Sequence, residues 1–312
     1  MTRSVFFIIG FITVVCQLIY LPIPEQTQHY LFFSGIILLG IPHGAADLLV
    51  AGRTAGEEKK SFSKMRFLTV YVSMLLAFGA LLWFFPLLGG ILFILLSAYH
   101  FGETDLNFVN VGSVLGKLLV TSYGILIISV ILFSHFEEVK LLLEPFNIVL
   151  KNRGFINWLS EQRYYLMSFS VLIFFTSLFL YLFKNGVEVF LSKDRFLIGF
   201  ASMVFILFNL PLLLGFTFYF VAWHSLFSLK NIVGYLRKSE DISPMLIVQK
   251  MLLYSSIAIG GIAIFGVASF FFFTGGSAVI YPFLGLAVLT APHMLVMHDM
   301  YNRIRIDNLA VN

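Results

Sequence analysis

Residues 34–50 read SGIILLGIPHGAADLLV, an apolar run that carries His43 and Asp47 one helical turn apart. A helix that crosses a bilayer needs about 20 mostly apolar residues, and ionisable side chains are costly inside it. The rest of the chain supports a membrane location, because 59% of its 312 residues are hydrophobic and only 12% are charged. Soluble domains have about 25% charged residues. We therefore predict an integral-membrane protein in which these two polar residues have a function.

Charge and cysteine content limit the partners and the kinds of metal site to be expected. The formal net charge is +4, and the basic residues fall between apolar runs, so they indicate orientation in a bilayer rather than binding of nucleic acid. Cys16 is the one cysteine of the chain, which excludes an intramolecular disulfide and a cysteine-ligated metal cluster. The lipid bilayer is the expected partner, and nucleic acid is not.

Apolar runs of spanning length predict an all-α, polytopic transmembrane helical bundle of about ten spans in a single domain, residues 1–312. Strands are not expected, because an open sheet edge leaves backbone groups unsatisfied in lipid. No small-residue cleavage site follows the first run, so we expect it to be retained as a span. The weakest divisions between spans lie around Pro86 and Pro211. The predicted spans are 4–22, 29–50, 67–85, 87–103, 115–134, 164–183, 195–212, 215–232, 249–273 and 278–299.

Lys and Arg residues are distributed unevenly between the two sides of these spans. With the N-terminus inside, all but four of the 20 lie on the cytoplasmic side, which predicts a multi-pass protein of the cell membrane with both termini cytoplasmic. The exceptions share one long loop, 135–163, which we interpret as an interfacial amphipathic segment or an ordinary surface loop. The loop contains Lys140, Lys151, Arg153 and Arg163, and the apolar residues Phe146, Ile148, Val149, Phe155, Ile156 and Trp158.

Five of the seven histidines fall on even-numbered spans, all in the half nearer the cytoplasm. These spans run in the same direction, so their histidines lie at similar depth, which helix packing alone does not require. Imidazoles from four helices at one depth can converge on a metal ion in the bundle interior. The five are His43, His100, His224, His293 and His298, whereas His29 and His135 lie at outer ends of spans and resemble interfacial residues.

Each of these histidines is followed by other polar residues. The motifs are PHGAAD (42–47), YHFGETD (99–105), WHSLFS (223–228) and PHMLVMHD (292–299). A carboxylate about one turn away can orient a ligand imidazole through its other ring nitrogen. Pro42 and Pro292 are expected to bend their helices, and Gly44 and Gly102 to admit a close backbone approach.

The donor type and its surroundings indicate the metal chemistry. Imidazole-only sites suit iron, zinc, copper or nickel, and a catalytic site keeps an open position. Aromatic residues beside the histidines favour an apolar substrate that reaches the metal from within the bilayer. Together these features point to ferrous iron and O₂. The aromatic residues are Tyr99, Phe101, Tyr219, Phe220 and Trp223.

The ordered set PHGAADL, AYHFGETD, WHS and PHMLVMH resembles the Brp/Blh family of integral-membrane β-carotene 15,15′-dioxygenases. The motifs extend from residue 42 to residue 298, so the resemblance covers nearly the whole chain. It implies an Fe(II) enzyme that cleaves β-carotene at its central double bond with O₂ and forms two molecules of retinal. It also implies that the retinal supplies a microbial rhodopsin, with no organic cofactor required.

The resemblance also implies a ligand set. His43, His100 and His224 match the first three motifs, but several members of the family carry a second histidine one turn after the third motif, where this chain has Ser228. His293 can supply the fourth ligand, with His298 as a less favoured substitute. The predicted metal ligands are therefore His43, His100, His224 and His293, with Asp47 in support.

Other classes are to be weighed against this one. A di-iron desaturase or hydroxylase needs clustered histidine boxes that the sequence lacks. A membrane b-type haem protein would use paired axial histidines on facing helices. A multi-span transporter or proton-coupled channel could use Asp47, Glu103 and Asp105 as a relay, although no inverted repeat is visible.

Overall fold

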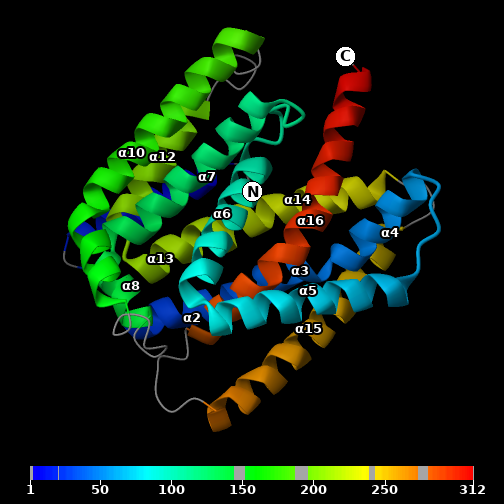
Figure 1. Cartoon of the computed structure of the whole chain (residues 1–312), viewed down its shortest axis with the longest axis horizontal. Coiled ribbons are helices and arrows are strands. Elements are labelled where there is room, and N and C mark those ends of the chain that lie inside the picture. Colours follow the sequence, from blue (N-terminus) through cyan, green and yellow to red (C-terminus); the bar gives the residue numbers. More distant parts are fainter. Residues whose placement is uncertain are drawn as a thin grey trace.

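All regular secondary structure in the described residues is helical (Figure 1). The computed structural model describes residues 3–19, 21–143, 152–186, 196–238, 243–272 and 280–311. Eight of its helical segments are long and apolar enough to cross a membrane, and two further apolar helices, near the N-terminus and at Phe196–Asn209, are shorter. The predicted all-helical, multi-span fold is confirmed.

Each predicted span coincides with a helix or a run of joined helices. The second span consists of four consecutive pieces and the eighth of three, and both include a π-helical segment, labelled η. The elements are α1 (Arg3–Leu18), α2 (Glu25–Gly35), η1 (Ile36–Gly40), α3 (Ile41–Ala45), α4 (Asp47–Glu57), α5 (Lys64–Phe84), α6 (Pro86–Asp105), α7 (Val114–Ser134), α8 (Phe136–Leu143), α10 (Arg153–Asn185), α12 (Phe196–Asn209), α13 (Leu212–Phe216), η3 (Thr217–Ser225), α14 (Leu226–Arg237), α15 (Pro244–Phe272) and α16 (Ile280–Val311).

Helix ends differ from the prediction in two places. In the predicted loop 135–163, α8 and the first turns of α10 are helical, and Ser160 on α10 donates to Glu137 on α8 over 3.4 Å. Its central apolar residues, Phe146, Ile148 and Val149, lie outside the described residues. α16 continues well past residue 299, because its last turns make polar contacts with α6 that hydropathy does not reveal.

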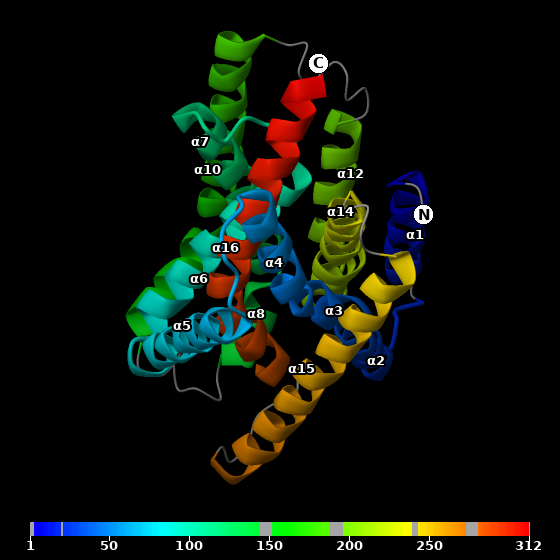
Figure 2. The same ribbon diagram turned by 90° about the vertical axis from the view of Figure 1, so that its right-hand side faces the viewer.

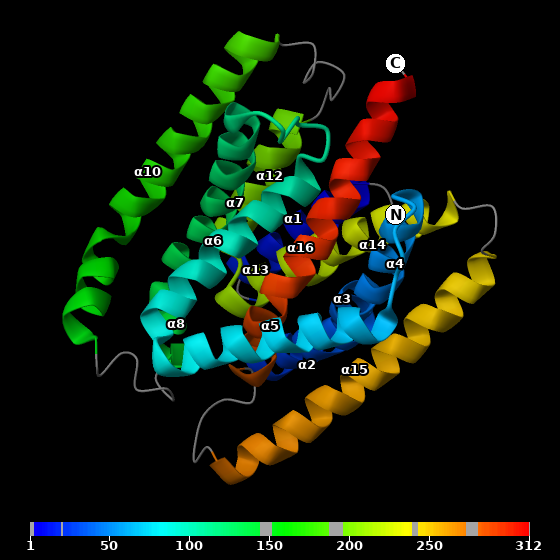
Figure 3. The same ribbon diagram turned by 45° about the vertical axis from the view of Figure 1, so that its right-hand side comes forward.

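The outer surface of the bundle carries large apolar side chains. Phe84 on α5 is 71% exposed, Phe183 on α10 is 84% exposed and Ile264 on α15 is 73% exposed. Figure 3 shows α10 and α15 at opposite outer edges of the bundle. Such exposure suits a surface in contact with lipid and would be a liability in water.

The backbones of α6 and α7 approach closely at glycines. A Cβ on Gly124 of α7 would lie 1.8 Å from the carbonyl oxygen of Ala98, and one on Gly102 of α6 would lie 1.9 Å from that of Val120. Small residues at helix crossings allow this packing in membranes. The expected close approach is confirmed at Gly102 but was wrong at Gly44, where a Cβ would meet no atom within 4 Å.

Replacing Gly124 with alanine should therefore destabilise the protein by about 1–3 kcal/mol, because the new methyl group forces the two backbones apart. Thermal unfolding in detergent measures the effect. Gly90→Ala is the matched control, since a Cβ at Gly90 on α6 meets nothing within 4 Å. Equal unfolding temperatures for the two variants would contradict the packing described here.

The segments that carry the histidine motifs pack together in the bundle interior. α16 runs through the middle and contacts α4, α5 and α6, while η3 contacts α6 and η1. Figure 2 shows α16 between α6 and α4, with α1 on the far side of the bundle near α12. The π segment η1 ends directly before α3, and η3 carries one of the histidines. π-helical turns are rare, and those that occur are frequently at functional sites. The two π segments therefore indicate that a functional site lies in this interior.

Candidate metal centre

The four predicted ligands come from four different helical segments and are all buried. His43 lies on α3, His100 on α6, His224 on η3 and His293 on α16. Their exposed fractions are 3%, 3%, 0% and 7%. The sequence-based expectation that these side chains meet in the interior is therefore met by the geometry.

The four imidazoles meet as two close Nε2 pairs, and His293 joins the candidate metal-binding trio of His43, His100 and His224 through His43. His43 Nε2 lies 2.8 Å from His293 Nε2, and His100 Nε2 lies 3.2 Å from His224 Nε2. The His43 ring centroid is 4.4 Å from that of His293 and 5.3 Å from that of His224, and His100 is 5.0 Å from His293. Potential ligand atoms of His43, His100 and His224 all lie within 4.8 Å of one another.

Asp47 supports this group through a helix other than its own. Its carboxylate oxygens lie 2.8 and 3.0 Å from Nδ1 of His293 on α16, and the Tyr71 hydroxyl on α5 donates to Asp47 over 2.7 Å. A neutral His293 therefore keeps its proton on Nδ1 and points the Nε2 lone pair inward. The role expected for Asp47 fits this geometry, with His293 as its partner. Tyr71 was not expected, and a tyrosine in an apolar span gives no signal of such a role.

The donor set fits a metal ion. Two imidazole nitrogens bound at right angles about 2.1 Å from one metal lie about 3.0 Å apart, close to the two Nε2 separations found here. Nδ1 of His43, His100 and His224 has no hydrogen-bond partner among the described residues. Buried imidazoles satisfied mainly by one another are costly in apolar surroundings. A cation between the Nε2 atoms would bind their lone pairs in place of the close nitrogen–nitrogen contacts, while a carboxylate partner at Nδ1 is present for His293.

Asp47→Asn should lower metal affinity about 10–100-fold, the usual effect of losing the partner of a ligand histidine. Tyr71→Phe should act in the same direction but less, since Asp47 keeps both contacts with His293. Anaerobic Fe(II) titration against a competing chelator measures both. Tyr30→Phe, at a side chain that is 64% exposed, is the control. Parent-like affinity in Asp47→Asn would refute this role.

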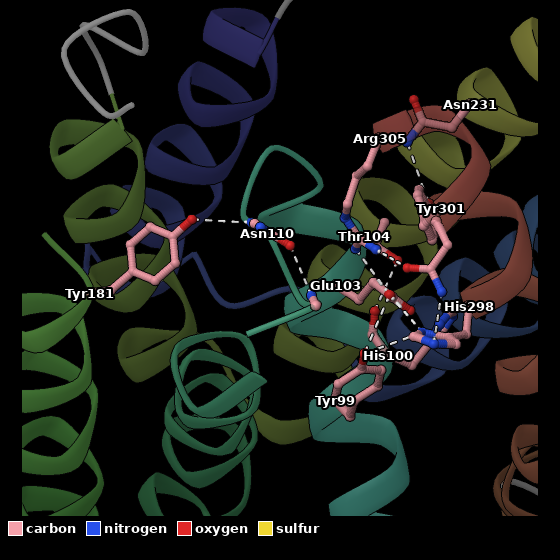
Figure 4. Close-up of polar contacts among 12 residues, drawn as sticks. Tyr99, His100, Glu103, Thr104, Asn110, Tyr181, Asn231, His298, Tyr301 and Arg305 are labelled. Carbon is pink, nitrogen blue, oxygen red and sulfur yellow. Dashed lines mark hydrogen bonds and ion pairs between the residues drawn. The ribbon is translucent and has the colours of Figure 1, made fainter. Parts of the chain in front are cut away.

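His298 belongs to a neighbouring polar network rather than to the four-histidine group (Figure 4). Its Nδ1 lies 2.9 Å from Glu103, and its Nε2 accepts from Asn302 over 2.9 Å. Arg305 donates to the same carboxylate oxygen of Glu103. Arg305 was not expected, although His298, Asn302 and Arg305 follow one another at the i, i+4, i+7 spacing of one helix face.

Asp105 accepts three hydrogen bonds at the end of α6. The hydroxyls of Tyr123 and Tyr219 donate over 2.9 and 3.0 Å, and Trp223 Nε1 donates over 3.0 Å. This carboxylate thus joins α6 to α7 and to the segment that carries His224. Asp105 is a structural acceptor here, and its donors leave little freedom for a relay.

The predicted aromatic surroundings divide into two groups. Phe101 and Phe220 lie beside His224, with ring centroids 4.7 and 5.8 Å from it. Tyr99, Tyr219 and Trp223 turn their polar atoms to Glu103, His298 or Asp105 instead. Two of the five aromatic residues therefore contact a histidine of the group through their rings alone.

The remaining positions singled out in the sequence lie outside the group. Ser228 is fully buried, and its hydroxyl lies 3.4 Å from that of Tyr301 on α16. His29 is hydrogen-bonded to the carbonyl oxygen of Glu25. Burial lowers the pKa of His135, at the start of the α7–α8 connection, below its usual value. Ser228 and His29 thus have hydrogen-bond partners that involve no metal.

Comparison with known proteins shows similarity to one enzyme family over most of the chain. A family model described as "Beta-carotene 15,15'-dioxygenase" matches residues 34–301. A relative of the same name from uncultured marine bacterium 66A03 is 24% identical over 279 residues, which is 88% of this chain and 95% of the relative. No solved structure matches. The matched region contains all four converging histidines together with Asp47 and Glu103.

Proposed function

This chain belongs to the β-carotene 15,15′-dioxygenase family, and on that premise we propose that it uses Fe(II) and O₂ to cleave β-carotene at its central double bond. The products are two molecules of retinal. The observation that supports the proposal most strongly is the close approach of four buried imidazoles, which form the Nε2 pairs His43–His293 and His100–His224 and whose ring centroids approach to 5.0 and 5.3 Å between the pairs. The whole chain acts as one membrane domain around this centre.

The bound iron would supply the activation of O₂, for which imidazole ligands are suitable. The residues of the chain position and shield it. The four histidines would fix the metal from four helical segments, and Asp47 holds His293 in the tautomer that presents Nε2. Cleavage adds one oxygen atom to each carbon of the double bond, so no net proton is taken up or released and no general base is needed.

The surroundings of the histidines suit an apolar substrate. Phe101 and Phe220 present ring faces and edges beside His224, and the histidines themselves are nearly inaccessible to solvent. Burial excludes water from the reacting centre, and a polyene held against these rings would be positioned without hydrogen bonds. β-Carotene would enter from the bilayer, where an apolar molecule of this kind is dissolved.

We place the enzyme in the cell membrane with both termini in the cytoplasm, following the distribution of Lys and Arg. The metal centre then lies in the cytoplasmic half of the bilayer. Retinal released there would be available to a microbial rhodopsin in the same membrane, which is the pathway partner we propose.

The geometry gives less support to the alternatives. In a haem protein, the ligand nitrogens of two axial histidines lie on opposite sides of the iron, about 4 Å apart, whereas the facing Nε2 atoms here lie 2.8 and 3.2 Å apart.

A transporter would need its three candidate relay carboxylates to exchange protons, but each carboxylate is engaged with its own donors. These donors are Tyr71 and His293 for Asp47, His298 and Arg305 for Glu103, and Tyr123, Tyr219 and Trp223 for Asp105.

Expression in a bacterium that accumulates β-carotene tests the proposal. Extracts should lose β-carotene and gain two retinals for each molecule lost, with no change in the empty-vector strain. Apocarotenoids of unequal length would show cleavage at another bond and overturn central cleavage. Undiminished β-carotene in cells that contain folded, iron-loaded protein would overturn the proposal that β-carotene is the substrate.

A further inference from the structure

An ion pair is buried between the two helices that carry His100 and His293. Arg305 Nη2 on α16 lies 2.9 Å from Glu103 Oε1 on α6, and the exposed fractions of the two side chains are 10% and 0%. Glu103 follows His100 by one helical turn. The pair therefore joins two of the segments that meet at the proposed iron.

The pair is the centre of a closed ring of polar contacts (Figure 4). Arg305 Nη1 donates to Asn302 over 2.8 Å, Asn302 donates to His298 Nε2 over 2.9 Å, and His298 Nδ1 lies 2.9 Å from Glu103. Three residues from one face of α16 are thus oriented around a single oxygen of α6. Because a guanidinium donates in fixed directions, this ring defines both the rotation and the height of α16 against α6.

Stability alone does not explain why the pair is buried. Taking two charges out of water is costly, and their attraction offsets the cost only when the remaining polar atoms are also satisfied. Glu103 Oε2 and Arg305 Nε have no hydrogen-bond partner among the residues that the structure describes. The best-attested use of such a buried polar group is to fix the register of packed helices.

Register matters here because the metal ligands are distributed over several helices. A functional site must be held within about 0.5 Å of its working geometry, and a slip of one residue moves a helix by about 1.5 Å along its axis. A slip of that size would withdraw Nε2 of His293 from its position 2.8 Å from His43.

We propose that Glu103 and Arg305 are positioning residues for the metal centre, which hold α16 in the register that lets His293 and His100 share one ion. The inference rests on the proposed function only through the four-histidine site, and it does not depend on the identity of the substrate. It assigns a role to two residues that touch neither the metal nor the polyene.

Co(II) titration of the purified protein in detergent, with thermal unfolding measured in parallel, tests this role. Glu103→Gln should lower Co(II) affinity about 10-fold, the low end of the range for direct partners of ligand histidines, because Glu103 acts through the position of α16, and it should shift the Co(II) visible absorption bands. Arg305→Lys should have an intermediate effect, since it keeps the charge but not the paired donors. The double variant E103L/R305M replaces the pair by apolar side chains of similar size, a change that is often tolerated for stability. It should unfold near the parent's temperature and still bind Co(II) weakly.

Tyr181→Phe is the matched control. It removes the partly buried hydrogen bond from the Asn110 amide to the Tyr181 hydroxyl, 3.1 Å long, which lies away from His100 and His298 (Figure 4). This variant should unfold at a lower temperature and bind Co(II) as the parent does.

Parent-like affinity and spectrum in E103L/R305M would overturn the positioning role. So would Co(II) affinities that follow the unfolding temperature in every variant, Tyr181→Phe included, because the pair would then act through stability alone. A parent protein that binds no Co(II) would overturn the metal site of the proposed function itself.

Discussion

Replacing His43 or His100 with alanine should abolish retinal formation in cells that accumulate β-carotene. Each substitution removes one imidazole from a pair of facing Nε2 atoms. His298, in the neighbouring polar network, is bonded at both ring nitrogens and does not replace it. Retinal should fall to the level of the empty-vector strain and β-carotene should accumulate.

Folded protein must be shown in the same experiment. The alanine variants should reach the membrane fraction in parent-like amounts and purify without iron. His29→Ala is the control, because His29 is half-buried and its hydrogen bond in the described residues is to the backbone of its own helix. Retinal production by His43→Ala at more than a small fraction of the parent's rate would contradict the proposed site.

The second large effect concerns the fourth ligand. His293→Ala should lose iron and activity as completely as His43→Ala, whereas Ser228→Ala should retain both. His293 lies in the group and is oriented by Asp47, while Ser228 contacts Tyr301, which keeps a second partner in Asn231. His298→Ala should be intermediate, because His298 takes part in the ring around Glu103.

Iron content by elemental analysis and retinal yield measure this contrast. If Ser228→Ala lost iron while His293→Ala kept it, the ligand would lie on α14 rather than on α16. The serine at position 228, where several members of the family carry a histidine, would then have to supply the ligand itself.

The helical fold and the candidate histidines could be predicted from the sequence because both depend on patterns local to it. Apolar runs of spanning length indicated the ten helical segments, and prolines marked the narrow divisions, as at Pro86 between α5 and α6. Histidines near the same end of spans that run in the same direction lie at similar depth. That argument singles out five histidines, His43, His100, His224, His293 and His298, and the preference for His293 over His298 came from the family resemblance.

Other features depend on contacts between distant segments. Asp47 is four residues from His43, but its partner is His293, 246 residues away. Gly44 and Gly102 look equivalent in the sequence, yet only Gly102 lies at a helix crossing. The π-helical segments η1 and η3 also have no counterpart in the hydropathy pattern, because a change of hydrogen-bond register leaves composition unaltered.

The central claim is that one iron ion is held by four histidines, and X-ray absorption at the iron edge of the purified protein tests it most directly. The parent should show one iron per chain and the multiple-scattering pattern of four imidazoles, with nitrogens at about 2.1 Å. His293→Ala should show a reduced imidazole pattern or no iron. A parent spectrum with two or fewer imidazoles, or a haem spectrum, would contradict the account.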